Sequence, residues 1–258
     1  MSAARLTVDV RGPEDAPPLV MGASLGTTAA MWEPQIDTLA RHFRVVRYDH
    51  RGHGGSEAPD GPYSIDALGH DVLAMLDTIN LERVSYCGLS LGGMIGMWLA
   101  ANAPQRVERL ALVCTSAQLG PETMWRERAA RVRARGTAPE VEAAIGRWFT
   151  PGFVARRGDV VAAAGRWLSS VSGEGYAGCC EAIAGMDLRG VLPAIAAPTL
   201  VVAGAEDVAI PVDHAEIIAA GIPGAVLSVI PDAGHLANLE QPEAMTHLLL
   251  DHLLGVTT

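Results

Sequence analysis

Short apolar runs rich in β-branched residues recur along the chain, and longer stretches with helical periodicity separate them. In residues 64–79, for example, apolar side chains recur every three or four positions, which is typical of a helix with one buried face. Strands that alternate with helices predict a mostly parallel β-sheet covered by helices on both faces. The predicted strands span residues 6–10, 19–21, 43–48, 84–87, 110–114, 199–203 and 226–230.

One long segment interrupts this alternation, because no convincing strand lies between residues 114 and 199. Helical patterns cover residues 121–135, 140–149 and 159–170 instead. The segment also holds three of the five tryptophans, Trp125, Trp148 and Trp167. A helical insert between two strands of an α/β sheet predicts a cap over the sheet, although extra helices packed on the sheet are the alternative. We expect a core of residues 1–118 and 191–258 and a helical cap of residues 119–190.

The sequence GLSLG at residues 88–92 fits the pattern G-x-S-x-G and lies between a predicted strand and an apolar helical stretch. In such a strand–turn–helix unit the serine occupies a sharp, strained turn, and the flanking glycines let strand and helix approach closely. The N-terminus of the helix also offers a partial positive charge to a developing oxyanion. This context favours Ser90 as a nucleophile; an ordinary turn between a strand and a helix is the alternative.

A serine nucleophile needs a histidine base, and the base needs a carboxylate that orients it. Where a nucleophile elbow is present, the residues follow in the order serine, acid, histidine. Asp207 and His235 each follow a predicted strand, so both lie where α/β sheets collect functional residues. We predict a catalytic triad of Ser90, Asp207 and His235. The alternatives are a solvated loop role for His235, a helix-cap role for Asp207, and Glu206 or Asp232 as the acid.

The oxyanion of a tetrahedral intermediate needs backbone N–H donors close to the nucleophile. We expect one donor at Leu91, the residue after the serine. The second is expected in the loop at residues 22–28, whose small residues let backbone N–H groups turn toward the serine, and we assign it to Leu25. Ser24 in the same loop is a competing nucleophile, but it has no elbow around it.

The remaining histidines are weaker candidates for the base. His50 and His53 lie around the glycine-rich turn RGHGGS at residues 51–56, which follows a predicted strand. We interpret this turn as a structural element near the site rather than as the source of the base. His247 and His252 lie in the C-terminal helical stretch, where surface or packing roles are expected.

Composition and charge limit the classes of function. Hydrophobic residues make up 49% of the 258 residues and charged residues 19%, so the chain can bury a sizeable core. The net charge of −10 argues against binding to nucleic acid or to an anionic membrane surface. The four cysteines show neither metal-ligand nor disulfide spacing, and we expect a reducing compartment, the cytoplasm. We also expect no signal peptide and no membrane span.

The motifs together resemble those of the α/β-hydrolase superfamily, and more narrowly those of the 3-oxoadipate enol-lactonases of the β-ketoadipate pathway. The resemblance runs nearly from end to end, and its specific part lies in the cap, where these enzymes vary most. The chain departs from the family pattern at Ala23, where asparagine is expected, and at Leu91, where methionine is usual. The similar segments include SLGT at 24–27, RGHG at 51–54, CGLSLGGMIG at 87–96, RWFTP at 147–151, EGYAGCC at 174–180 and GHLANLEQP at 234–242.

This resemblance implies an α/β-hydrolase fold with a mostly parallel central sheet, helices on both faces and a helical cap inserted after the sixth strand. It implies hydrolysis of 3-oxoadipate enol-lactone to 3-oxoadipate through an acyl-enzyme, with neither a metal nor an organic cofactor. The implied partner is a small lactone that carries a carboxylate, and self-association into a homo-oligomer is a further expectation. The alternatives are a general carboxylesterase, a C–C bond hydrolase with the same triad, and a non-catalytic ligand-binding module.

A carboxylate on the substrate requires a local cation in this acidic chain, and arginine binds carboxylates through two parallel hydrogen bonds. The expected cap contains a basic stretch with five arginines between residues 126 and 135. We expect Arg133 to face the pocket, with a solvated helix face as the alternative for each of these arginines. Trp148 is expected to form an apolar pocket wall, with packing inside the cap as the alternative. The next candidates for the cation are Arg128, Arg131 and Arg147.

Overall fold

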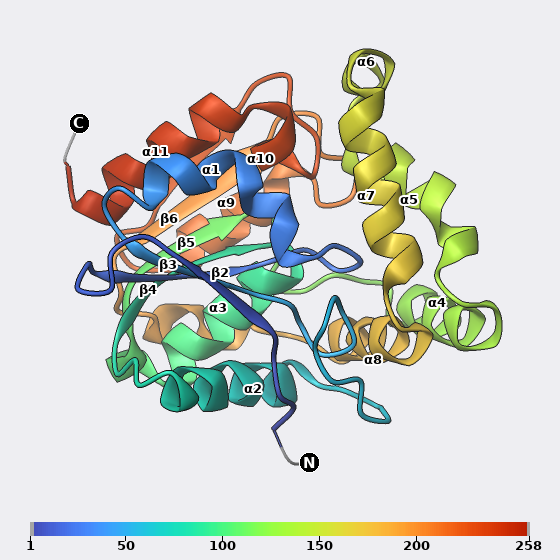
Figure 1. The fold of residues 1–258 in the computed structure, drawn as a ribbon, viewed down its shortest axis with the longest axis horizontal. Coiled ribbons are helices and arrows are strands. Elements are labelled where there is room, and N and C mark those ends of the chain that lie inside the picture. The colour runs from blue at the N-terminus through green and yellow to red at the C-terminus, as the bar shows by residue number, and fades with distance from the viewer. Residues whose placement is uncertain (1–2, 257–258) are drawn as a thin grey trace.

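The computed structural model describes residues 3–256, which form one seven-stranded sheet (Figure 1). The strands are β1 (Val8–Arg11), β2 (Pro18–Gly22), β3 (Arg44–Tyr48), β4 (Val84–Leu89), β5 (Val107–Val113), β6 (Thr199–Gly204) and β7 (Val226–Ile230). Their order in the sheet is β1-β3-β2-β4-β5-β6-β7. β1 pairs antiparallel with β3, and the other neighbouring pairs are parallel. The mostly parallel sheet predicted from the alternation is confirmed.

Helices cover both faces of this sheet. Those outside the segment between β5 and β6 are α1 (Glu33–Leu39), α2 (Ile65–Thr78), α3 (Leu91–Asn102), α9 (Val212–Gly221), α10 (Ala237–Glu240) and α11 (Pro242–Leu254). Short 3₁₀ turns are η1 (Ala29–Trp32), η2 (Pro104–Arg106) and η4 (Arg189–Ala194). α1 packs against α11 on one face, and α2 packs against α3 on the other (Figure 1).

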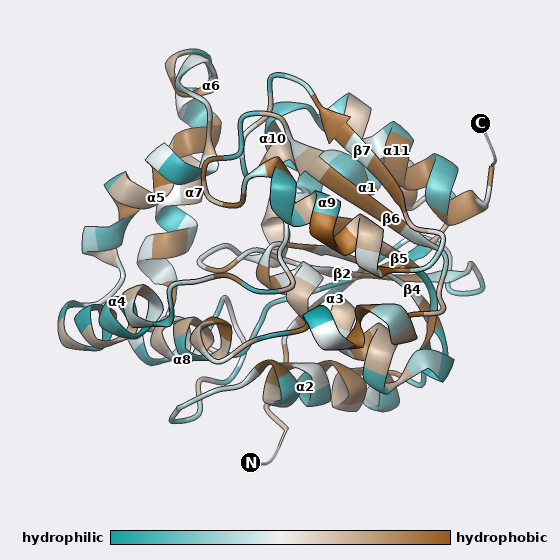
Figure 2. Ribbon diagram, turned by 180° about the vertical axis from the view of Figure 1, so that it is seen from behind, coloured by the Kyte–Doolittle hydropathy of each residue, from teal (hydrophilic) through white to brown (hydrophobic). Residues whose placement is uncertain are grey.

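The centre of the sheet is the most deeply buried part of the molecule. Every residue of β4 is buried, and the helix that follows it, α3, buries nearly all of its side chains. A helix that is apolar on all sides belongs in a protein interior. Figure 2 shows that β5, β6 and β7 are among the most hydrophobic segments. The turn between β4 and α3 is therefore held between closely packed elements of the core.

Five helices lie between β5 and β6 and gather to one side of the sheet (Figure 1). They are α4 (Glu122–Arg135), α5 (Val141–Trp148), α6 (Pro151–Arg156), α7 (Gly158–Ser170) and α8 (Gly173–Ala184), with the turn η3 (Ala138–Glu140). We refer to residues 122–184 as the helical insert. α4, α5 and α7 match the predicted helical stretches, whereas α6 and α8 were not predicted. The limits 119–190 for a cap domain stay a prediction.

The position of the insert in the strand order differs from the expectation. The insert follows β5, the fifth strand along the described chain, and not the sixth. In residues 3–256 a single strand, β1, precedes β2, and it closes the sheet as an antiparallel edge. The expected count therefore included one strand more before the insert than this sheet contains.

A close backbone contact joins α8 to the loop that follows β3. Gly175 in α8 and Gly52 in the loop approach so closely that a Cβ on either would collide with the Cα of the other. The Ser172 N–H donates a hydrogen bond to the Gly52 carbonyl at 3.0 Å. One turn further along α8, Gly178 packs against the ring of Tyr63. The helical insert is therefore anchored to the core through α8.

None of the helices formed by residues 3–256 is long and apolar enough to cross a membrane. The expected cytoplasmic location and self-association stay predictions, because each depends on properties beyond a single folded chain.

Candidate active site

Ser90 lies at the turn between β4 and α3 in a strained backbone conformation. Its φ of 56° and ψ of −115° are rare for a residue that has a side chain. The Ser90 N–H donates to the Val113 carbonyl at 2.9 Å, and the Ser90 carbonyl accepts from the Thr115 hydroxyl at 2.7 Å. Glycine is needed on both sides of the turn, since a Cβ on Gly88 would collide with the Gly92 backbone and a Cβ on Gly92 would collide with the Gly22 backbone. This geometry is that of a nucleophile elbow.

His235 and Asp207 form a buried pair in the loops that follow β7 and β6. Nδ1 of His235 lies 2.8 Å from Oδ2 of Asp207, and their side chains are 4% and 0% exposed. Because a carboxylate only accepts hydrogen bonds, Nδ1–H is the donor. Oδ1 of Asp207 accepts the backbone N–H groups of Ala209 at 2.8 Å and Ile210 at 2.9 Å. In the tautomer that this hydrogen bond selects, the ring proton lies on Nδ1 and Nε2 carries none, as a general base requires.

Glu206 and Asp232, the alternative candidates for the acid, lie in positions typical of surface and turn residues. Glu206 and Asp232 are both exposed, and the hydrogen bond from His235 goes to Asp207. Asp232 has a φ of 52°, and its carbonyl accepts a hydrogen bond from the Gln241 side chain, which is typical of a turn residue. Asp207 is thus the carboxylate that orients His235. Its catalytic role stays a prediction.

Ser90 and His235 line one cavity of about 240 Å³ between the sheet and the helical insert. Ser90 is only 7% exposed, so a reactant reaches its hydroxyl through this cavity. Ser24, the competing nucleophile, also lines the cavity, but its backbone does not adopt the positive φ that marks the elbow. The walls that the helical insert contributes include Met124, Trp125, Arg128, Arg147, Trp148 and Tyr176.

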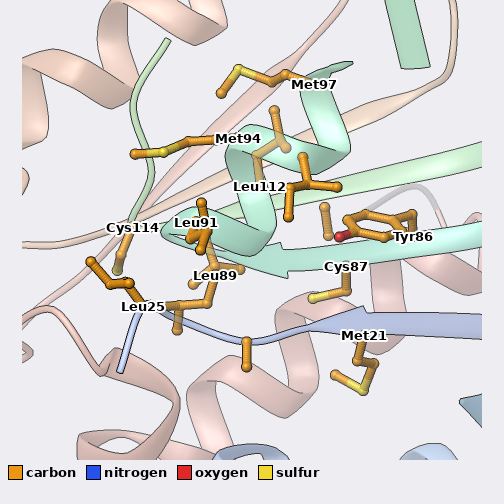
Figure 3. Close-up of a cluster of buried hydrophobic side chains, with 14 of the residues drawn as sticks. Met21, Leu25, Tyr86, Cys87, Leu89, Leu91, Met94, Met97, Leu112 and Cys114 are labelled. Atoms are coloured by element: carbon orange, nitrogen blue, oxygen red, sulfur yellow. The ribbon is translucent and has the colours of Figure 1, made fainter. Parts of the chain in front are cut away.

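The two amides predicted to hold an oxyanion belong to the residue after the serine and to the loop after β2. Leu91 is the first residue of α3, so its N–H is one of the amides without an acceptor inside the helix. Leu25 lines the cavity, and within residues 3–256 its N–H has no protein acceptor. The Gly92 N–H donates to the Ala23 carbonyl at 3.0 Å, which ties the Leu25 loop to the start of α3. Figure 3 shows Leu25 beyond the end of β2 and Leu91 at the start of α3. Their role stays a prediction.

Arg133 does not line the cavity, so the expectation that it faces the pocket was wrong. Its guanidinium group is held by two carboxylates of α8, with Nε 2.8 Å from Glu174 and Nη1 2.5 Å from Glu181. Hydrogen bonds to Glu181 and Glu174 raise the pKa of Arg133 above its ordinary value. A cation already paired twice has little left to offer a substrate. Arg133 instead helps to join α4 to α8.

Arg128 and Arg147 are the cations that do line the cavity. The Arg128 guanidinium group stacks over the Trp125 ring at 4.5 Å from its centroid. The ion pairs of the helical insert use Arg126, Arg131, Arg133 and Arg157, and within the described residues neither cavity arginine has a carboxylate partner. Burial, followed by the nearby Arg128 cation, lowers the pKa of Arg147. Two unpaired cations at one cavity wall favour an anionic ligand.

Trp148 lines the cavity as expected and is itself almost completely buried. It is the last residue of α5, and its carbonyl accepts the Leu236 N–H at 3.0 Å. That hydrogen bond connects the helical insert to the residue after His235. Trp148 therefore has both of the locations considered for it, against the cavity and within the packed insert. A contact with substrate stays a prediction.

The cysteines and the acidic residues offer little to a metal ion. Within residues 3–256, no group of three or more His, Cys, Asp or Glu side chains has an arrangement that could hold one. The free thiols of Cys87, Cys114, Cys179 and Cys180 are buried. Burial raises the pKa of the Cys180 thiol to about 12, which disfavours the thiolate that binds metals.

Comparison with known proteins places this geometry in a family. A family model described as the alpha/beta hydrolase fold matches residues 17–242. 3-Oxoadipate enol-lactonase 2 of Acinetobacter baylyi is 41% identical over 236 residues, which are 92% of this chain and 88% of the relative. The crystal structure of the enol-lactonase from Burkholderia xenovorans LB400 matches with a TM-score of 0.95 at 41% identity and covers 97% of each chain. A malate-bound esterase from Thermogutta terrifontis matches with a TM-score of 0.93 at 29% identity, covering 99% of this chain and 95% of that one. The chain belongs to the alpha/beta hydrolase fold family.

Proposed function

We propose that the protein is a serine hydrolase that opens an enol-lactone bearing a carboxylate, with 3-oxoadipate enol-lactone as its substrate. The observation that carries the proposal is one cavity lined by Ser90, His235, Arg128 and Arg147, in which neither arginine has a carboxylate partner among residues 3–256. The similarity to two enol-lactonases supports the lactone. The related esterase whose structure holds malate supports a cavity suited to a small carboxylate.

The positions of the polar groups support the following reaction. Ser90 Oγ attacks the lactone carbonyl while Nε2 of His235 takes its proton, and Asp207 stabilises the imidazolium ion that forms. The N–H groups of Leu25 and Leu91 bind the oxyanion. The single bond between the acyl carbon and the ring oxygen then breaks, and the ring oxygen leaves as an enolate. His235 protonates this enolate, and the product tautomerises to the ketone. His235 then activates water, and attack on the acyl-enzyme releases the diacid.

The two cavity arginines would bind the carboxylate that does not react. Within the described residues each has hydrogen-bond donors without carboxylate partners, and a bound anion would offset the burial and the repulsion from Arg128 that lower the pKa of Arg147. A charge-assisted hydrogen bond contributes about 1.5–3 kcal/mol. That free energy corresponds to about a 10- to 150-fold preference in kcat/KM for the charged lactone over its neutral methyl ester.

Hydrolysis of the enol-lactone and of its methyl ester by the purified protein tests the proposal. Arg147→Met and Arg128→Met should each reduce kcat/KM for the charged lactone about 10- to 150-fold and leave the neutral ester almost unaffected. Arg133→Met is the matched control, because this arginine is paired outside the cavity. Equal turnover of both lactones by the unmodified protein would contradict the anionic substrate and favour a general carboxylesterase, which the likeness to the esterase also supports.

A further inference from the structure

His53 connects the turn after β3 to the loop that carries Leu25, and it is completely buried. Its Nδ1 lies 3.1 Å from the Arg51 carbonyl, which can only accept, so Nδ1 carries the proton. Nε2 is then the acceptor for the Gly26 N–H at 3.0 Å. Both hydrogen bonds require the neutral ring with its proton on Nδ1. The His53 ring therefore joins the turn to the loop through this one tautomer.

The two peptide groups on either side of the Leu25 Cα are held by different contacts, which together fix the position of that Cα. The Ser24 carbonyl, which shares a peptide plane with the Leu25 N–H, accepts from the Thr27 N–H at 3.1 Å and from the Thr27 hydroxyl at 2.9 Å. In a trans peptide the carbonyl and the N–H point in opposite directions. The two hydrogen bonds from Thr27 to the Ser24 oxygen therefore make the Leu25 N–H point away from Thr27. His53 holds the following peptide through Gly26.

A second histidine fixes the start of the same loop. Nε2–H of His50 donates to the Ala23 carbonyl at 2.7 Å, and that carbonyl also accepts the Gly92 N–H at the start of α3. The rings of His50 and His53 lie edge to face with their centroids 6.0 Å apart. Burial, followed by the electrostatic interaction with His50, lowers the pKa of His53 to about 3, so the ring stays neutral at physiological pH.

We propose that His53 is a positioning residue: its neutral imidazole holds the Gly26 peptide, which fixes the Leu25 Cα from its C-terminal side, so that the Leu25 N–H, aimed by the Ser24 peptide, stays directed toward the oxyanion. Without this acceptor the buried Gly26 N–H would lose its hydrogen bond, and the peptide after Leu25 could rotate. The inference rests on the oxyanion role proposed above for Leu25. It does not depend on which ester or lactone the protein hydrolyses.

Two variants of His53 separate positioning from packing. His53→Gln places an amide oxygen close to the position of Nε2 and can still accept from Gly26, whereas His53→Leu keeps a similar volume without an acceptor. With p-nitrophenyl acetate we expect His53→Leu to lower kcat about 10- to 100-fold, somewhat less than outright loss of an oxyanion donor. KM should change less than about twofold, and His53→Gln should recover most of kcat. His252→Leu, a half-buried histidine of α11, is the matched control.

Inhibition by a trifluoromethyl ketone gives a second readout, because its adduct with the serine carries an oxyanion. The inhibition constant should rise in His53→Leu by about the factor lost from kcat/KM, a proportionality expected of a transition-state analogue. His53→Gln, which keeps an acceptor for the Gly26 N–H, should leave the constant close to that of the unmodified protein, and a marked rise would overturn the inference even if His53→Leu folds poorly.

The outcomes of these measurements are distinct. Unchanged kcat in His53→Leu, with Ser90→Ala inactive, would overturn this inference and leave the proposed function standing. Equal losses in His53→Leu and His53→Gln, with lowered melting temperatures, would show a packing role and would also overturn it. Full activity of Ser90→Ala would refute the proposed function itself.

Discussion

Replacement of Asp207 by asparagine should preserve the fold and reverse the tautomer of His235. An asparagine amide has one oxygen that accepts and one NH₂ group that donates. The backbone N–H groups of Ala209 and Ile210 both point at Oδ1, so the amide oxygen must remain there. The NH₂ group then faces Nδ1 of His235, which has to become an acceptor. The imidazole proton therefore moves to Nε2, and the ring can no longer take the proton of Ser90.

The expected loss is large because the residual base is almost absent. In a serine-protease triad the same change costs about 10⁴-fold in kcat, which is about 5.4 kcal/mol of activation free energy. Because each hydrogen bond of the buried pair is replaced by another, the melting temperature should change by only a few degrees. Initial rates with p-nitrophenyl acetate measure the first effect, and ¹⁵N chemical shifts of the His235 ring report the tautomer directly.

The exposed acids provide the controls for this prediction. Glu206→Gln and Asp232→Asn should each leave kcat within about twofold, since neither carboxylate contacts the imidazole. Retention of more than about a tenth of the activity by Asp207→Asn would refute the reasoning, as would an unchanged His235 tautomer. A large loss in Asp232→Asn would move the acid to that position.

Three further predictions concern the nucleophile, the insert and pH. Ser90→Ala should lower kcat by about 10⁴-fold or more and abolish labelling by a fluorophosphonate; labelling that persists would place the nucleophile elsewhere. Gly175→Ala should lower the free energy of unfolding by about 1–3 kcal/mol in a urea titration, whereas Gly146→Ala, with open space around its Cα, should not destabilise the protein. The His53 pKa is lowered to about 3 from its usual 6.5, so its contribution to stability is complete above about pH 6.5 and is lost as the pH falls toward 3. Urea titrations from pH 7.5 to 5 give the free energy of unfolding at each pH. Its dependence on pH should be weaker in His53→Gln by up to about 1.4 kcal/mol per pH unit, and an unchanged dependence would contradict a neutral buried ring.

The parts of the site that the sequence predicts are those governed by local signals and sheet topology. The elbow at Ser90 is a strand, a glycine-flanked turn and a helix in direct succession, and each is visible as a pattern. Asp207 and His235 follow the last two strands, and the carboxyl ends of parallel strands meet at one edge of the sheet. Residues far apart in the chain could therefore be assigned to one site.

The cation was misassigned because composition does not reveal which face of a helix is buried. α4 turns Trp125, Ala129 and Val132 inward. Arg128 lies three residues after the tryptophan and four before the valine, so it shares their side of the helix. The spacing of Arg128 from these apolar residues thus indicated that it faces inward, but the expectation followed the number of arginines in the stretch instead. The pairing of Arg133 depends on carboxylates of α8, a helix that was not predicted.

α8 was missed because its sequence is a poor helix former. It contains Gly173, Gly175 and Gly178, and glycine costs about 1 kcal/mol relative to alanine within a helix. The structure explains two of these glycines, because Gly175 meets the Gly52 backbone and Gly178 meets the Tyr63 ring. Tertiary contact, rather than local propensity, stabilises this helix. Such a helix leaves almost no signal in a single sequence.

The contact between Gly52 and Gly175 also bears on how the enzyme could be re-engineered. Gly52 precedes His53 in the chain, so the joint between the helical insert and the core is one residue away from the ring that holds the oxyanion loop. A chimaera that imported a whole insert without glycine at this crossing would disturb the turn and, through it, the loop that carries Leu25. α4 and α5, which line the cavity without forming this joint, are the modules to exchange when a different substrate range is wanted.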